Sequence, residues 1–254
     1  MNMNSVRQKR KERYLYDSRG YNSGADNFDN GVSNKFSQRN HHGLWWDYRR
    51  AQEFVQLLNA HKITLKNATI LDIGCHHGFF TSCLAYIKKS SSGVYGVDFI
   101  QDSITIARQF NPGITFVQGD VYDMPYKDGF FNVVLCNYVF NAIPHKDISQ
   151  IAANISSKVK SGGHIIFFDF YNSPFINFCN RLLYGNIRKT RKLPTFDNTI
   201  IKEIFPEYEI VESKKIINIF RLPMLLKFKL PYWLVSFLDV FFPKYYYLGL
   251  LRKK

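Results

Sequence analysis

Residues 68–80 read Ala68-Thr-Ile-Leu-Asp72-Ile-Gly74-Cys-His-His-Gly78-Phe-Phe80, and this stretch decides the fold class. Its apolar beginning predicts a buried strand, its glycines predict a tight turn, and the apolar residues after Gly78 predict the start of a helix. A strand that turns sharply into a helix points backbone N–H groups and the positive end of the helix dipole at whatever lies beyond the strand. The stretch therefore predicts a ligand-binding loop at the carboxyl end of a strand.

The glycine spacing of this loop argues against a nicotinamide dinucleotide. A dinucleotide-binding turn carries G-x-G-x-x-G, whereas Cys75, His76 and His77 separate Gly74 from Gly78 here. These three side chains do not suggest a metal site either, because consecutive residues on a tight turn cannot easily converge on one ion. We therefore expect no metal in the loop.

From Lys66 onward, short apolar runs alternate with segments of helical periodicity, which is typical of βαβ units and a mainly parallel sheet. An earlier segment, 44–58, has apolar residues at a three-to-four spacing and predicts an amphipathic helix with the Arg49-Arg50 pair at its middle. We expect strands near 69–73, 93–97, 114–118, 132–136, 164–169, 209–216 and 245–251. Further helices are expected near 79–87, 101–108, 148–158 and 198–204.

Polar residues stand at the ends of the next three expected strands. Asp98 ends the second strand 20 positions after Gly78, where a carboxylate can accept hydrogen bonds from both hydroxyls of a ribose. Asp120 and Val121 follow the third strand, and Asn137 ends the fourth. The carboxyl ends of parallel strands meet at one edge of a sheet, so we expect these residues to share a site.

In order and spacing, these features resemble the class I S-adenosylmethionine-dependent methyltransferases, and especially the small-molecule group that includes ubiquinone and menaquinone biosynthesis enzymes. Asp72, Gly74 and Gly78 match the family's (D/E)xGxGxG motif, with His76 in place of the middle glycine. The resemblance covers about residues 68–170. It implies a Rossmann-like α/β three-layer sandwich, with a mostly parallel seven-stranded sheet whose last strand is antiparallel. It also implies the cofactor S-adenosyl-L-methionine, bound by Asp72, Gly74, Cys75, Gly78, Asp98, Asp120, Val121 and Asn137.

The residues after the fourth strand bear on the methyl acceptor. Asn137-Tyr138-Val139-Phe140 is not the (D/N)PPY turn of enzymes that methylate amino groups, and Cys136 is not preceded by the proline of cytosine C5 enzymes. His145 follows this strand on the face where the acceptor should sit, and a histidine there can accept a proton near neutral pH. We name His145 as the candidate catalytic base, with an ordinary loop histidine as the alternative interpretation.

Charge is distributed unevenly along the 254 residues. Residues 1–50 hold 10 Lys/Arg against 5 Asp/Glu, residues 51–180 hold 9 against 9, and residues 181–254 hold 15 against 6. Basic ends around a neutral middle suit contact with phosphate on a nucleic acid or a membrane surface, although they serve solubility equally well.

The expected organisation is a flexible basic N-terminal arm, 1–40, followed by a methyltransferase domain, 41–254, with lid-like insertions at about 173–192 and 221–243. Prolines and an aspartate interrupt the second insertion, so it is too short to span a bilayer. Its Trp, Phe and Leu beside lysines suit an interfacial helix, a lid over the acceptor or a core helix, and the sequence leaves all three open.

We expect a methyltransferase that acts on a small, apolar or lipid-linked acceptor. One alternative is an RNA methyltransferase that uses the basic flanks, but no RNA-binding module is recognisable, so nucleic acid is the less favoured partner. A second alternative is a catalytically silent binding protein with this fold. It is suggested by His76 and by Asn132, which stands in the fourth strand where the family usually has an aspartate. Four cysteines without a CxxC pair, and a polar basic N-terminus, favour a cytoplasmic protein, peripheral to a membrane if 221–243 touches one.

Overall fold

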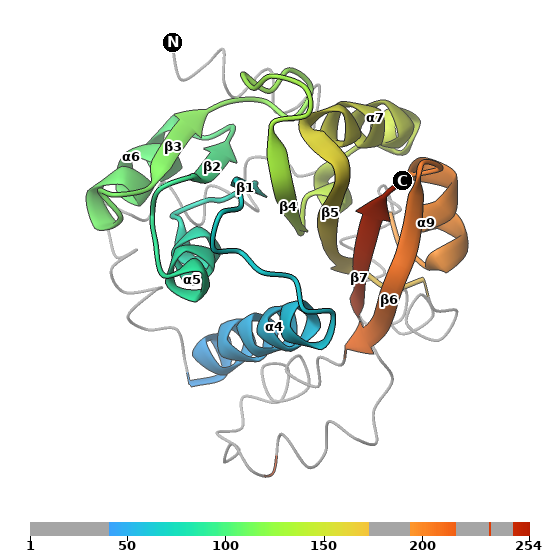
Figure 1. Cartoon of the computed structure of the whole chain (residues 1–254), viewed down its shortest axis with the longest axis horizontal. Helices are drawn as coiled ribbons and strands as arrows, with labels where there is room; N and C mark the ends of the chain where they lie inside the picture. The colour runs from blue at the N-terminus through green and yellow to red at the C-terminus, as the bar shows by residue number, and fades with distance from the viewer. Residues whose placement is uncertain (1–40, 173–193, 217–233, 235–245) are drawn as a thin grey trace, which may run out of the picture.

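The structure is a computed structural model that describes residues 41–172, 194–216, 234 and 246–254 (Figure 1). The expected N-terminal arm, 1–40, lies outside these residues. So do the expected insertions at 173–192 and 221–243, apart from Leu234.

A seven-stranded sheet with the order β3-β2-β1-β4-β5-β7-β6 forms the centre of the molecule. Neighbouring strands pair in parallel from β3 to β5, whereas β7 is antiparallel to both β5 and β6. This arrangement confirms the predicted mostly parallel sheet with an antiparallel last strand. The strands are β1 Ile70–Ile73, β2 Val94–Asp98, β3 Thr115–Gln118, β4 Phe131–Asn137, β5 Val159–Phe170, β6 Tyr208–Ile216 and β7 Tyr246–Lys253.

Helices cover both faces of this sheet, and all five expected helices are confirmed (Figure 1). Along β4, Val133 and Leu135 pack in one core cluster with α4, α5 and α6, while Val134 and Cys136 pack in a second cluster with α7 and α9. Because neighbouring side chains of a strand point to opposite faces, this alternation produces the predicted three layers. The helices are α4 His41–Ala60, α5 Phe79–Lys88, α6 Gln101–Phe110, α7 Ile148–Lys158 and α9 Asn198–Ile204, with 3-10 turns η2 Phe140–Ala142 and η3 His145–Asp147.

The fifth strand differs from its prediction at its beginning. We expected it to start at His164 after a turn, but β5 already begins at Val159. Phe131 of β4 pairs with Val159 and Val133 pairs with His164, so residues 160–163 bulge out of the ladder. Gly162 has a φ of 71°, a left-handed conformation that glycine adopts without a steric penalty. The expected turn is therefore a bulge within the strand.

None of the helices in the described part of the chain has the length and apolar character that crossing a bilayer requires.

Candidate functional site

The loop after β1 alternates left-handed residues in a way that explains its glycines. Gly74, His76 and Gly78 have φ values of 68°, 50° and 81°. For a residue with a side chain this conformation costs about 1–2 kcal/mol, and glycine avoids that cost. His76 therefore adopts a left-handed backbone conformation, which a glycine at this position of the motif would adopt without that cost.

The two glycines of the loop have different surroundings. A Cβ atom on Gly78 would lie 2.7 Å from the ring of Phe116, so Gly78 is needed for close packing. A Cβ on Gly74 would meet only Val139, at 3.6 Å, and Gly74 is exposed. Gly74 thus presents bare backbone at the carboxyl edge of the sheet, where a ligand can approach closely.

Asp98 joins the end of β2 to this loop. Its carboxylate accepts hydrogen bonds from the backbone N–H of His76 at 2.9 Å and from the backbone N–H of Ile100 at 2.8 Å. Its exposed fraction is 8%. The backbone thus holds Asp98 beside the loop, as the predicted ribose contact requires.

Asp72, at the end of β1, is more deeply buried, with an exposed fraction of 2%. Its carboxyl oxygen accepts a hydrogen bond of 2.6 Å from Thr81 Oγ1 of α5. Burial raises the pKa of Asp72 to about 7, with a further increase from the negative charge of Asp98, while the Thr81 hydrogen bond and the charge of Arg50 oppose it. Asp72 is therefore an acid that titrates near neutral pH.

Arg50 on α4 reaches the same edge and is not among the predicted site residues. Its Nη1 donates a hydrogen bond of 3.0 Å to Asn137 Oδ1 at the end of β4. Its guanidinium carbon lies 4.5 Å from the ring centroid of Phe80 and 5.1 Å from that of Tyr138. With an exposed fraction of 7%, Arg50 places a positive charge close enough to Asp72 to lower the pKa of that acid.

The position of Arg50 in the helix pattern was a usable signal. Arg50 precedes the buried Phe54 by four residues and the buried Leu57 by seven, which places it on the core-facing stripe of α4. An arginine in phase with an apolar stripe is unusual, because arginine is almost never fully buried unless it is paired.

Three further predicted cofactor residues lie at the carboxyl edge with different degrees of burial. Cys75 and Val121 are buried, each in one of the two core clusters, so their side chains pack against protein. Burial also raises the pKa of the Cys75 thiol, which therefore stays protonated. Asp120 is half-buried, and its carboxylate accepts a hydrogen bond of 3.1 Å from the backbone N–H of Tyr122.

Aromatic rings gather where the acceptor is expected. Tyr138 follows β4 with a φ of 60°, an uncommon value for an aromatic residue. Its ring centroid lies 5.8 Å from that of Phe170 and 5.3 Å from that of Tyr246. The ends of β4 and β5 and the start of β7 therefore share one aromatic cluster, in which Tyr246 is buried and Tyr138 and Phe170 are partly buried.

His145 and Asp169 occupy opposite environments on this side. His145 is exposed at the start of η3. Asp169 is fully buried and accepts hydrogen bonds from the backbone N–H groups of Asn141 and Phe170, at 3.0 and 2.9 Å. Burial raises the pKa of Asp169 to about 7. Asp169 thus supports the turn after β4, whereas His145 is open to solvent.

No group of three or more His, Cys, Asp or Glu side chains within the described ranges is arranged to hold a metal ion. The residues that meet at the carboxyl edge of the sheet are the exposed glycine Gly74, the basic Arg50 and the acids Asp72, Asp98 and Asp120. A sequence-family model described as a methyltransferase domain matches residues 64–222. The chain belongs to this methyltransferase family.

The cofactor of the family, S-adenosylmethionine, is the one that the sequence predicted. Curated relatives of this methyltransferase include a demethylmenaquinone methyltransferase of Bacillus licheniformis, 27% identical over 128 residues, which are 49% of this chain and 50% of the relative. A phthiotriol/phenolphthiotriol dimycocerosates methyltransferase of Mycobacterium ulcerans is 30% identical over 112 residues, which are 43% of this chain and 40% of the relative. The chain thus spans half or less of the length of these two relatives.

A similar solved structure is the magnesium protoporphyrin IX methyltransferase of Synechocystis PCC 6803 with bound SAH. It has a TM-score of 0.60 and 15% sequence identity, and the match covers 81% of this chain and 83% of that one. At this identity the likeness supports the methyltransferase fold alone.

Asn132 does not bear on the methyltransferase site. It lies near the amino end of β4, where its Oδ1 accepts hydrogen bonds of 2.9 Å from both the backbone N–H and the hydroxyl of Thr69. It therefore ties the beginning of β4 to the residue before β1, at the edge opposite the loop. Its replacement of the usual aspartate is no argument for a silent protein.

Proposed function

We propose that this chain transfers a methyl group from S-adenosylmethionine to a small, apolar or lipid-linked acceptor. The observation that carries the proposal is the open backbone of Gly74 at the carboxyl edge of the sheet, together with Asp98 hydrogen-bonded to the same loop and Arg50 hydrogen-bonded to the end of β4. This edge is where ligands bind in open α/β sheets.

The charges at this edge suit an amino-acid zwitterion beside a ribose. Arg50 can bind the carboxylate of the methionine portion by charge-assisted hydrogen bonds, and Asp72 lies close enough to complement its ammonium group. Asp98 can accept from the ribose hydroxyls. S-adenosylmethionine supplies an electrophilic methyl group on its sulfonium, so the main task of the chain is to hold and orient donor and acceptor.

The acceptor side is apolar. The partly buried rings of Tyr138 and Phe170 can contact an apolar acceptor. By their names, the two relatives act on demethylmenaquinone and on phthiotriol or phenolphthiotriol dimycocerosates. His145 stays the predicted base for an acceptor that must lose a proton, because it is exposed and follows β4.

The test uses the purified chain, S-adenosylmethionine with an isotopically labelled methyl group, and two acceptor pools: an organic-solvent lipid extract and total RNA. We expect label in an organic-soluble product, found by mass spectrometry, and none from Asp98→Asn, which removes the charge while keeping the side-chain volume. Label that followed the RNA pool would favour the RNA methyltransferase alternative. If calorimetry found no cofactor binding at millimolar concentration, the enzyme proposal would fail.

A further inference from the structure

A cavity of about 690 Å³ lies at the amino edge of the sheet, opposite the loop after β1. The connection from α4 to β1, the bulge of β5 and the end of β7 form its walls. Its lining includes Asn132, near the beginning of β4, whereas Asn137 ends that strand at the cofactor site. Five residue steps at about 3.3 Å each separate the two residues by about 16 Å. The cavity is therefore distinct from the methyl-transfer site.

Basic residues from two parts of the chain line this cavity. Lys62 and Lys66 come from the α4–β1 connection, and Arg252 comes from β7. Among the described residues that line it, Glu209 is the single acid. Arg252 Nη1 lies 3.7 Å from Glu209 Oε1, and both side chains are more than half exposed, so this pair is weak. The remaining charge of the lining is positive.

Two histidines also line this cavity. His164 pairs with Arg252 across β5 and β7, and His61 belongs to the α4–β1 wall. Burial lowers the pKa of His164, and the positive charge of Arg252 lowers it further, while Glu209 opposes them, so the neutral form of this imidazole is favoured. His61 in turn contacts Glu212 at 2.5 Å. The positive charge of the lining therefore comes from Lys62, Lys66 and Arg252.

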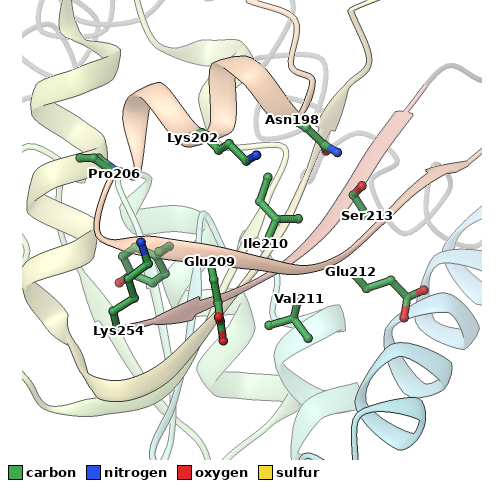
Figure 2. Close-up of a pocket in the computed structure, with 10 residues that line it drawn as sticks. Asn198, Lys202, Pro206, Glu209, Ile210, Val211, Glu212, Ser213 and Lys254 are labelled. Atoms are coloured by element: carbon green, nitrogen blue, oxygen red, sulfur yellow. The ribbon is translucent and has the colours of Figure 1, made fainter.

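A neighbouring cavity on edge strand β6 lacks this excess of positive charge. It has a volume of about 650 Å³ and is lined by Lys202 and Lys254 but also by Glu209 and Glu212 (Figure 2). In Figure 2 the side chains of Glu209 and Val211 lie on one side of β6, and both also line the basic cavity. Glu209 therefore marks the boundary between a charge-balanced cavity and a basic one.

We propose that the basic cavity binds a phosphate-type oxyanion carried by a larger molecule, at a site separate from the cofactor. The planar guanidinium of Arg252 and the ammonium groups of Lys62 and Lys66 are the donors that such anions favour. The volume exceeds the needs of a bare phosphate and falls in the range of sites for small organic ligands. The phosphate can belong to a soluble metabolite or to a lipid headgroup. This inference does not depend on the proposed methyl transfer.

The test measures binding of inorganic pyrophosphate by calorimetry, with the whole chain as wild type, as Lys66→Gln/Arg252→Gln and as Lys127→Gln/Lys202→Gln. The third protein loses the same two charges at exposed positions outside the cavity. We expect the first double variant to bind pyrophosphate at least about tenfold more weakly than wild type, and the control within about twofold. A parallel arm measures sedimentation of the three proteins with vesicles that contain phosphatidic acid.

The outcomes separate the two phosphate sources. A loss of pyrophosphate binding in the first double variant alone assigns the site to a soluble phosphate compound, and a matching loss of vesicle binding assigns it to a headgroup. The proposal is wrong if wild type does not bind pyrophosphate, if both double variants lose affinity equally, or if S-adenosylhomocysteine displaces the pyrophosphate. The last result would place the anion in the cofactor site instead.

Discussion

Replacing Arg50 by glutamine tests the cofactor site most directly, because it removes one positive charge from the carboxyl edge. The charge lies beside Asn137 and against the ring of Phe80, at the distances of 3.0 and 4.5 Å given above. If Arg50 binds the methionine carboxylate, its loss removes a charge-assisted contact worth about 2–4 kcal/mol in this mostly buried position. The dissociation constant for S-adenosylmethionine should then rise by about 30-fold to about 1,000-fold.

The measurement compares two ligands by calorimetry. S-adenosylmethionine carries the amino-acid carboxylate, whereas 5′-methylthioadenosine keeps the ribose and adenine but lacks the amino-acid portion. Arg50→Gln should weaken the binding of S-adenosylmethionine strongly and the binding of 5′-methylthioadenosine by no more than about twofold. Because only the ligand changes, this comparison separates loss of a direct contact from general disturbance of the site.

Arg49 provides a matched control one residue away. It pairs with Glu53 at 3.0 Å, its side chain is 40% exposed, and Arg49→Gln removes the same charge from the same helix. This control should leave both affinities unchanged. Equal weakening of the two ligands by Arg50→Gln, or no weakening of either, would refute the assignment and leave Arg50 as a structural residue between α4 and β4.

Three further outcomes follow from the site. Asp98→Asn should weaken S-adenosylmethionine and 5′-methylthioadenosine alike, by about tenfold or more in calorimetry, because both contain the ribose. Gly78→Ala should lower the free energy of unfolding by about 3 kcal/mol in urea titrations. Gly129 has a φ of 62° and nothing within 4 Å of an added Cβ, so Gly129→Ala should lower it by only about 1–2 kcal/mol. Equal losses in the two variants would contradict the packing argument. Asp72 and Asp169 have carboxyl pKa values of about 7, above those of the unfolded chain. The contribution of each carboxyl group to stability is therefore complete below about pH 4. It is lost as the pH rises to 7, by about 1.4 kcal/mol per pH unit. The difference in unfolding free energy between wild type and Asp169→Asn should therefore change across this range, and a constant difference would show that Asp169 titrates normally.

Much of the fold could be predicted because each local pattern agreed with the sheet that it enters. The segment from β1 to α7 alternates apolar strands with amphipathic helices, and its turns carry glycine or an acid where the chain reverses. The predicted start of β5 was wrong for a physical reason. Residues 160–163 are polar and glycine-rich, as in a turn, but the ladder between β4 and β5 resumes on both sides of them. Pairing between distant strands decided this boundary, and no local pattern carries that information.

The candidate site was predictable to the extent that it is built from strand ends. Strand ends lie at known positions in the pattern, so Asp72, Asp98 and Asn137 could be assigned to one edge from their spacing. Arg50 could not be assigned in the same way, since α4 precedes the first strand and the sequence does not fix where a leading helix packs. Tertiary contacts to Asn137, Phe80 and Tyr138 bring the guanidinium to the site.

The burial of Asp72 and Arg50 links stability to function in this chain. Burial raises the pKa of Asp72 and lowers the pKa of Arg50, so each group is held in an environment that disfavours its charged form. Such an environment destabilises the protein when no ligand is bound, but it strengthens the interaction with a ligand that brings the complementary charge. A zwitterionic ligand end brings both charges, and its binding should restore the charged form of Asp72 and release a proton near neutral pH. Calorimetry in buffers of different ionisation enthalpy would detect that proton, and a binding enthalpy independent of the buffer would show that Asp72 does not respond to the cofactor.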